Sequence, residues 1–188
     1  MQLKEYPAAR THFEKASTQH KEKEVHELAL LRLGETRALT RQWPQAEQAY
    51  QTLINTYGRG EWVRRAKLGL GWARENQRKY APAIEAYTSV VSGTQRDETA
   101  ARCQFQIGEC LFALNKHDEA IQALVKVSVT YGYPQWSSKA LLETGRVLEK
   151  QGKRDHAREQ YKEIVTTYAD SDAATVARER LQALGTGE

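Results

Sequence analysis

Histidine, cysteine and closely spaced glycine are the residues of this chain that could support metal binding, redox chemistry or nucleotide binding. The five histidines are scattered, and no two of them lie three or four residues apart as metal-binding pairs on a helix do. Cys103 and Cys110 fall seven residues apart in one predicted helix, which separates them by about 10.5 Å along the axis. A disulfide needs Cα atoms within about 7 Å, so we expect two free thiols and no metal site.

The run Gly69-Leu70-Gly71 begins like a dinucleotide-binding fingerprint. It lacks the third glycine and lies within a predicted helix, whereas the fingerprint requires a turn between a strand and a helix. We find neither a phosphate-binding loop nor a nucleophile with its base. The sequence therefore predicts a protein that is not an enzyme and needs no cofactor.

Composition favours an all-α protein, because the chain of 188 residues is 40% hydrophobic and contains only 4 prolines. The 28 basic and 24 acidic residues give a formal charge of +4 without a long run of one sign. We therefore expect neither a nucleic-acid partner nor a polybasic membrane anchor. No apolar stretch reaches the roughly 18 residues of a membrane span.

A period of 37 residues organises the chain. A glycine column, an alanine column and a mainly aromatic column recur at this spacing: Gly34, Gly71, Gly108 and Gly145; Ala46, Ala83, Ala120 and Ala157; Phe13, Tyr50, Tyr87 and Tyr161, with Leu124 in the remaining place. Such a period, with apolar residues at helical spacing, predicts a right-handed α-solenoid of antiparallel helix pairs. We expect each glycine to let the two helices of a pair cross closely against the alanine column, and the aromatic column to fill the gap between repeats.

We assign residues 1–188 to a single solenoid domain. Its expected parts are a half repeat at 6–18, full repeats at 23–57, 61–91, 96–131 and 135–168, and a capping helix at 171–184. Because a half repeat leaves an apolar face uncovered, we expect the natural chain to continue upstream of Met1.

The pattern resembles the tetratricopeptide repeat, through Leu33-Gly34 and Leu70-Gly71 in first helices and Ala46/Tyr50 and Ala83/Tyr87 in second helices. The long repeat is similar to a bacterial cell-envelope subgroup that includes outer-membrane assembly lipoproteins and the Tol-Pal-associated periplasmic repeat protein. That similarity implies a periplasmic or envelope location if an export signal lies upstream, and a cytoplasmic one otherwise.

The resemblance also implies a concave groove, lined by the first helices, that binds a peptide or helix. We expect the groove to be lined by Arg65, Leu68, Trp72, Arg102, Phe105, Glu109, Phe112, Lys139, Leu142 and Arg146. Trp72 and Phe112 are the main candidates for a binding hot spot, because the residues at equivalent positions of the other repeats are not aromatic. The apolar members of the set fit packing between neighbouring first helices equally well.

The sequence thus favours a non-catalytic scaffold that binds a protein or peptide partner. Two alternatives stay open: a structural solenoid that forms homo-oligomers through its N-terminal half repeat, and a helical-repeat protein that binds RNA.

Overall fold

The computed structural model describes residues 6–19 and 23–185, and all regular elements in these ranges are helices. The chain divides into two compact units, Met1–Val90 and Val91–Glu188. The first unit contains α1 (Tyr6–Gln19), α2 (Lys23–Leu39), α3 (Trp43–Tyr57), α4 (Val63–Asn76) and α5 (Tyr80–Val91), which ends one residue beyond the boundary. Those after it are α6 (Glu98–Ala113), α7 (His117–Lys126) with its π-helical extension η2 (Val127–Tyr131), α8 (Pro134–Lys150), α9 (Arg154–Thr167) and α10 (Asp172–Leu184). None of the described helices combines the length and apolar character that a membrane crossing requires.

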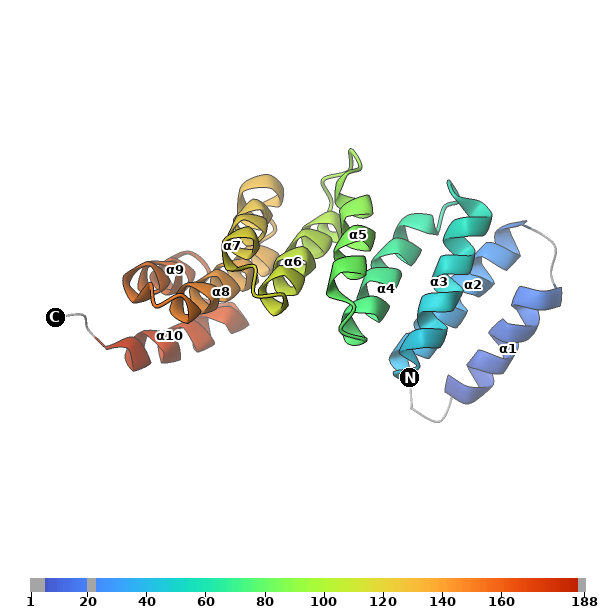
Figure 1. Ribbon diagram of the computed structural model, residues 1–188, viewed down its shortest axis with the longest axis horizontal. Coiled ribbons are helices and arrows are strands. Elements are labelled where there is room, and N and C mark those ends of the chain that lie inside the picture. Colours follow the sequence, from blue (N-terminus) through green and yellow to red (C-terminus); the bar gives the residue numbers. More distant parts are fainter. Residues whose placement is uncertain (1–5, 20–22, 186–188) are drawn as a thin grey trace. The chain divides into compact units, whose positions relative to one another are not determined.

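Within each unit the helices stack as repeated pairs (Figure 1). The first helices of the repeats are α2, α4, α6, α8 and α10, and the second helices are α1, α3, α5, α7 and α9. In the first unit α2 packs against both α3 and α4; in the second, α8 packs against α6, α7, α9 and α10. The all-α prediction and the arrangement in helix pairs are confirmed.

The glycine column packs against the aromatic column. A Cβ atom added to Gly34 would lie 2.5 Å from the Tyr50 ring, and one added to Gly71 would lie 2.4 Å from the Tyr87 ring. Any side chain would therefore push the two helices of the pair apart. We expected alanine opposite the glycines; the structure corrects this, because the aromatic ring itself occupies the space that the missing side chain leaves.

Tyr50 also contacts the following repeat. A Cβ atom on Gly69 in α4 would lie 2.4 Å from the Cζ atom of Tyr50, so this ring is held between glycines of two neighbouring first helices. The two glycines of the Gly69-Leu70-Gly71 run thus serve two different tyrosines, Tyr50 and Tyr87. This packing accounts for the run without any nucleotide.

Two of the buried tyrosines donate hydrogen bonds to glutamates of their own repeat. The Tyr87 hydroxyl lies 2.7 Å from a carboxylate oxygen of Glu75, and the Tyr161 hydroxyl lies 2.5 Å from one of Glu149. Arg180 of α10 pairs with Glu149 as well. Burial acts to raise the pKa of Glu149, but the hydrogen bonds from Arg180 and Tyr161 outweigh it and hold that pKa below its ordinary value.

The turn between the two helices of each repeat has the same backbone in every full repeat. The amide of Gln42 donates to the carbonyl of Arg37 at 2.8 Å, and three further bonds follow at 37-residue steps: Lys79 to Arg74, Lys116 to Leu111, and Lys153 to Leu148. This six-residue closure is a Schellman motif, which needs one residue in the left-handed region.

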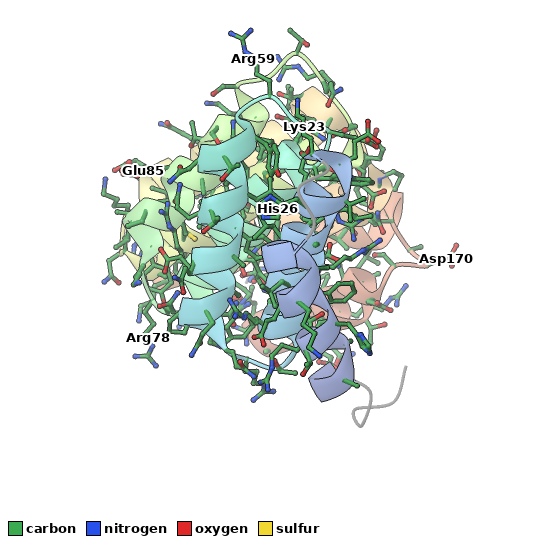
Figure 2. All side chains as sticks on the ribbon, turned by 90° about the vertical axis from the view of Figure 1, so that its right-hand side faces the viewer. Lys23, His26, Arg59, Arg78, Glu85 and Asp170 are labelled. Carbon is green, nitrogen blue, oxygen red and sulfur yellow. The ribbon has the colours of Figure 1, made fainter. Side chains whose placement is uncertain are left out.

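The left-handed residues of these turns are Arg41, Arg78 and Asn115, each with φ 59°, and Gly152, with φ 75°. Asparagine and glycine adopt this conformation readily, whereas the Cβ atom of arginine is crowded there. Figure 2 shows Arg78 projecting from one edge of the first unit and Arg59 from the opposite edge. Two of the four turns therefore carry a residue that their backbone disfavours.

The ring contact predicts different costs for two glycine substitutions in the second unit. Gly145→Ala should lower the free energy of unfolding by about 1–2 kcal/mol, because overpacking against the rigid Tyr161 ring outweighs the gain in helix propensity. Gly108→Ala should cost about 1 kcal/mol less, because it faces the more adaptable Leu124. Urea denaturation measures both. In a Tyr161→Leu background, the loss of unfolding free energy caused by Gly145→Ala should fall towards that caused by Gly108→Ala. If Gly145→Ala cost the same with and without the Tyr161→Leu substitution, the packing explanation would be contradicted.

The turn geometry predicts that Arg41→Gly and Arg78→Gly each stabilise the fold. Relief of the left-handed strain, about 1–2 kcal/mol, exceeds the entropy that glycine adds to the unfolded chain, so a net gain of about 0.5–1 kcal/mol is expected. Urea denaturation of both variants is the measurement, with Asn115→Gly as the control that should change little. Destabilisation by both substitutions would show that the arginine side chains support the fold.

The Glu149 contacts predict a pH-dependent loss. Glu149→Gln should cost about 1–2 kcal/mol at pH 7, where the wild-type carboxylate is charged and bound. Because the pKa of Glu149 is lowered in the folded protein, its carboxylate stabilises the fold above the ordinary value of 4.5, and this stabilisation is lost as the pH falls through the folded pKa. The difference in unfolding free energy between the variant and the wild type should therefore shrink towards pH 3. Urea denaturation at both pH values measures it. The exposed Glu163, substituted by glutamine, should show neither effect, and a Glu149 difference that persisted at pH 3 would refute the electrostatic account.

Candidate functional site

Three of the residues expected in the groove form one stripe along α4. Arg65 is exposed, and Leu68 and Trp72 are half-buried. The guanidinium of Arg65 lies 2.7 Å from a carboxylate oxygen of Glu35 in α2, so this charge is already paired within the unit. Steering of an acidic partner by Arg65 would have to compete with that ion pair.

Trp72 borders a hollow of about 350 Å³ in the first unit, which we call the Trp72 hollow. Its lining comes from the C-terminal ends of α2 and α4, the turn after α2 and the start of α3: Ala38, Leu39, Arg41, Trp43, Trp72 and Asn76. The indole rings of Trp43 and Trp72 meet edge to face, with centroids 5.1 Å apart. Asn76 donates to the Trp72 carbonyl at 2.9 Å. The hollow therefore combines apolar walls with a single formal charge, that of Arg41.

Sequence reasoning identified Trp72 but not its neighbours in the hollow. Leu39 is 54% exposed, and the equivalent residues one, two and three repeats later are Asn76, Ala113 and Lys150. Leu39 thus departs from its column as Trp72 does, a signal that the sequence already held. Trp43 gave no such signal, because another aromatic residue, Tyr80, follows it one repeat later.

In the second unit, Phe105 and Lys139 come together through Trp136. Phe105 is buried, and its ring centroid lies 5.6 Å from that of Trp136. The ammonium group of Lys139 lies 4.8 Å from the centroid of the Trp136 ring, within the range of a cation–π contact. Two residues expected to face a partner are therefore engaged with a tryptophan that we had not included.

The other candidates of this unit lie along α6 and α8. Arg102 and Arg146 are exposed, and Glu109 and Leu142 are half-buried. Leu142 packs against the core of the C-terminal repeat. Arg146 pairs with Glu143 at 2.7 Å; the charge of Glu143, then its hydrogen bond, and more weakly Glu109 raise the pKa of the guanidinium.

Phe112 has a packing partner that explains its departure from the repeat. The equivalent positions one repeat before and after hold Glu75 and Glu149, each of which accepts a tyrosine hydroxyl. The third repeat has Leu124 in place of that tyrosine, and Phe112 packs against the core cluster that contains Leu124. The third repeat thus has Phe112 and Leu124 where its neighbours have glutamate and tyrosine, and an apolar contact replaces the hydrogen bond. Phe112 therefore has a role in the fold.

A second hollow, of about 500 Å³, lies among α7, α8 and α9. Its lining is Asp118, Ile121, Gln122, Leu148, Lys153 and His156. None of these residues was among the groove candidates.

The first unit fills the equivalent space with a polar network. The guanidinium of Arg74 binds Glu47 at 2.9 Å and the Pro82 carbonyl at 3.0 Å. Two repeats later the positions of Arg74 and Glu47 hold Leu148 and Ile121. The second hollow therefore lies where Leu148 and Ile121 stand in place of an ion pair such as that of Arg74 with Glu47.

The titratable side chains that line the second hollow are Asp118, Lys153 and His156, and the one that lines the Trp72 hollow is Arg41. Within residues 6–19 and 23–185, no three side chains of the metal-binding types lie together. Cys103 and Cys110 are buried and form no disulfide, and His26 contacts the Tyr57 hydroxyl. What the Trp72 hollow can do chemically is exclude water from an apolar group and pair a negative charge.

A family model described as a tetratricopeptide repeat-like domain matches residues 35–186. No curated protein matches the chain significantly.

Solved structures resemble it at low sequence identity, which shows the fold alone. A crystal structure of MamA shares 19% identity, with a TM-score of 0.76 over 90% of this chain and 96% of that one. BtubC (BKLC) from P. vanneervenii shares 12%, with a TM-score of 0.77 over 96% and 82%. YrrB, described as a TPR protein with an unusual peptide-binding site, shares 17%, with a TM-score of 0.71 over 94% and 85%.

Proposed function

Because the chain belongs to the tetratricopeptide repeat-like family, we propose that it is a non-catalytic scaffold that binds a segment of a partner protein. The segment lies along the exposed faces of α2 and α4 in the first unit. Its anchor is an apolar side chain that enters the Trp72 hollow.

The observation that carries this proposal is the convergence of Leu39, Trp43 and Trp72 on one open hollow. Leu39 leaves 54% of its surface in water. The equivalent positions of the other repeats hold smaller or polar residues, so the repeat itself does not require an exposed leucine there. Both indole rings are half-buried. Apolar surface of this kind gains free energy when a partner covers it, and aromatic residues in such pockets supply much of the affinity of protein interfaces.

The fold supports the same conclusion. Neighbouring first helices pack against one another within each unit, so their exposed sides form a preformed surface that needs little reorganisation on binding. One protein of similar fold, YrrB, is described as having a peptide-binding site. Partner recognition by a rigid helical surface is the function that this arrangement fits.

The proposal predicts that Leu39→Gln weakens partner binding without unfolding the protein. Peptides selected from a random display library on the wild-type protein would be synthesised with a fluorophore, and their dissociation constants measured by fluorescence anisotropy. Loss of the Leu39 wall should weaken binding about tenfold, as expected for an apolar contact of this size.

Val129→Gln is the matched control, because Val129 is an exposed apolar residue, 80% accessible, in the other unit. It should bind the peptides as the wild type does. If Leu39→Gln bound them with wild-type affinity, or if no peptide were selected, the Trp72 hollow would not be the anchor site.

A further inference from the structure

Arg41 is held at the rim of the Trp72 hollow in a backbone conformation that disfavours it. Its φ is 59°. The same turn carries Arg78, also with φ 59°, in the next repeat, and Asn115 and Gly152, which accept the conformation more easily, in the two after it. Strained residues cluster where a side chain has a role apart from folding. Arg78 shares this strain and lies outside the hollow, so the strain alone does not mark a site; at Arg41 it coincides with an open apolar hollow that the residue itself lines.

The charge of Arg41 is free to meet a partner. In the part of the chain that the structure describes, the carboxylates of Glu35 and Glu47 pair with other basic side chains, and none pairs with Arg41. The rest of the lining is apolar or uncharged. An apolar group in this hollow would therefore have a cation beside it and no anion.

The surrounding unit carries the same sign. Over residues 6–19 and 23–90 there are 13 lysines and arginines against 8 acidic residues, whereas residues 91–185 hold 13 of each. The excess positive charge thus belongs to the unit that contains the Trp72 hollow. An acidic segment would be attracted to this unit before it docks.

We propose that the Trp72 hollow selects partner segments in which an aromatic or aliphatic residue stands within a few residues of an aspartate or glutamate. The apolar side chain packs against Leu39 and the two indoles, and the carboxylate pairs with Arg41. This inference rests on the function proposed above, to which it adds the chemistry of the partner.

The test is a selection of random displayed peptides on three proteins: wild type, Arg41→Gly and Arg78→Gly. Arg78 occupies the same left-handed turn position one repeat later and does not line the hollow. Both substitutions relieve the same strain and remove one positive charge. Any difference between them therefore reports the hollow and not the stability or net charge of the unit.

Peptides selected on wild type and Arg78→Gly should be enriched in acidic residues close to an apolar one, and those selected on Arg41→Gly should not. The strongest wild-type peptide should bind Arg41→Gly about two- to fivefold more weakly, the range expected for an exposed ion pair. A version of this peptide with amides in place of its acidic residues should bind the wild type more weakly by the same factor. It should bind Arg41→Gly with unchanged affinity.

Other outcomes overturn the inference. Equal acidic enrichment on wild type and Arg41→Gly, equal losses for Arg41→Gly and Arg78→Gly, or additive effects of the protein and peptide changes would each refute the pairing with Arg41. If peptides bind and depend on Leu39 but ignore Arg41, only this inference fails. If no selected peptide depends on Leu39, the proposed anchor site fails with it.

Discussion

The contact between a helix glycine and a tyrosine ring sets the distance on which the rest of each repeat depends. A Cβ atom at Gly145 would lie 2.3 Å from the Tyr161 ring, closer than packed atoms can approach. With the helices at this distance, the tyrosine hydroxyl reaches a glutamate one turn further along the first helix. Burial of the ring, the position of the carboxylate and the pairing of Arg180 all follow from the same missing side chain.

Much of this architecture could be predicted from the sequence, because a fixed period shows which residues occupy equivalent places. The helix pairs, the lack of a disulfide between Cys103 and Cys110, and the packing role of Gly34 and its equivalents follow from spacing alone. The period does not show which neighbour a residue faces, so the glycines were assigned to the alanine column when they face tyrosine. It also treats each column separately, which hides paired exchanges such as that of Phe112 with Leu124.

The site was predictable in part for related reasons. Trp72 departs from its column and does border a hollow. Arg41 was missed although Asn115 and Gly152, at the same position of later repeats, indicate a left-handed turn residue. The neighbours of its side chain are visible only in the structure. The two hollows also differ in origin. The Trp72 hollow gathers apolar residues beside Arg41, with which no carboxylate of the described residues pairs. The second hollow lies where Leu148 and Ile121 replace the Arg74 and Glu47 of the first unit. Size alone would have favoured the second, larger one.

The hydroxyl–carboxylate contact also determines where this chain could be cut and rejoined. Glu75 and Tyr87, like Glu149 and Tyr161, lie twelve residues apart and on either side of the turn within one repeat. A recombination point in that turn could join Tyr87 or Tyr161 to the first helix that carries Phe112, and would leave the tyrosine hydroxyl without its glutamate acceptor. A point after the second helix keeps both partners together. The exchangeable module of this solenoid is therefore a first helix with the second helix that follows it.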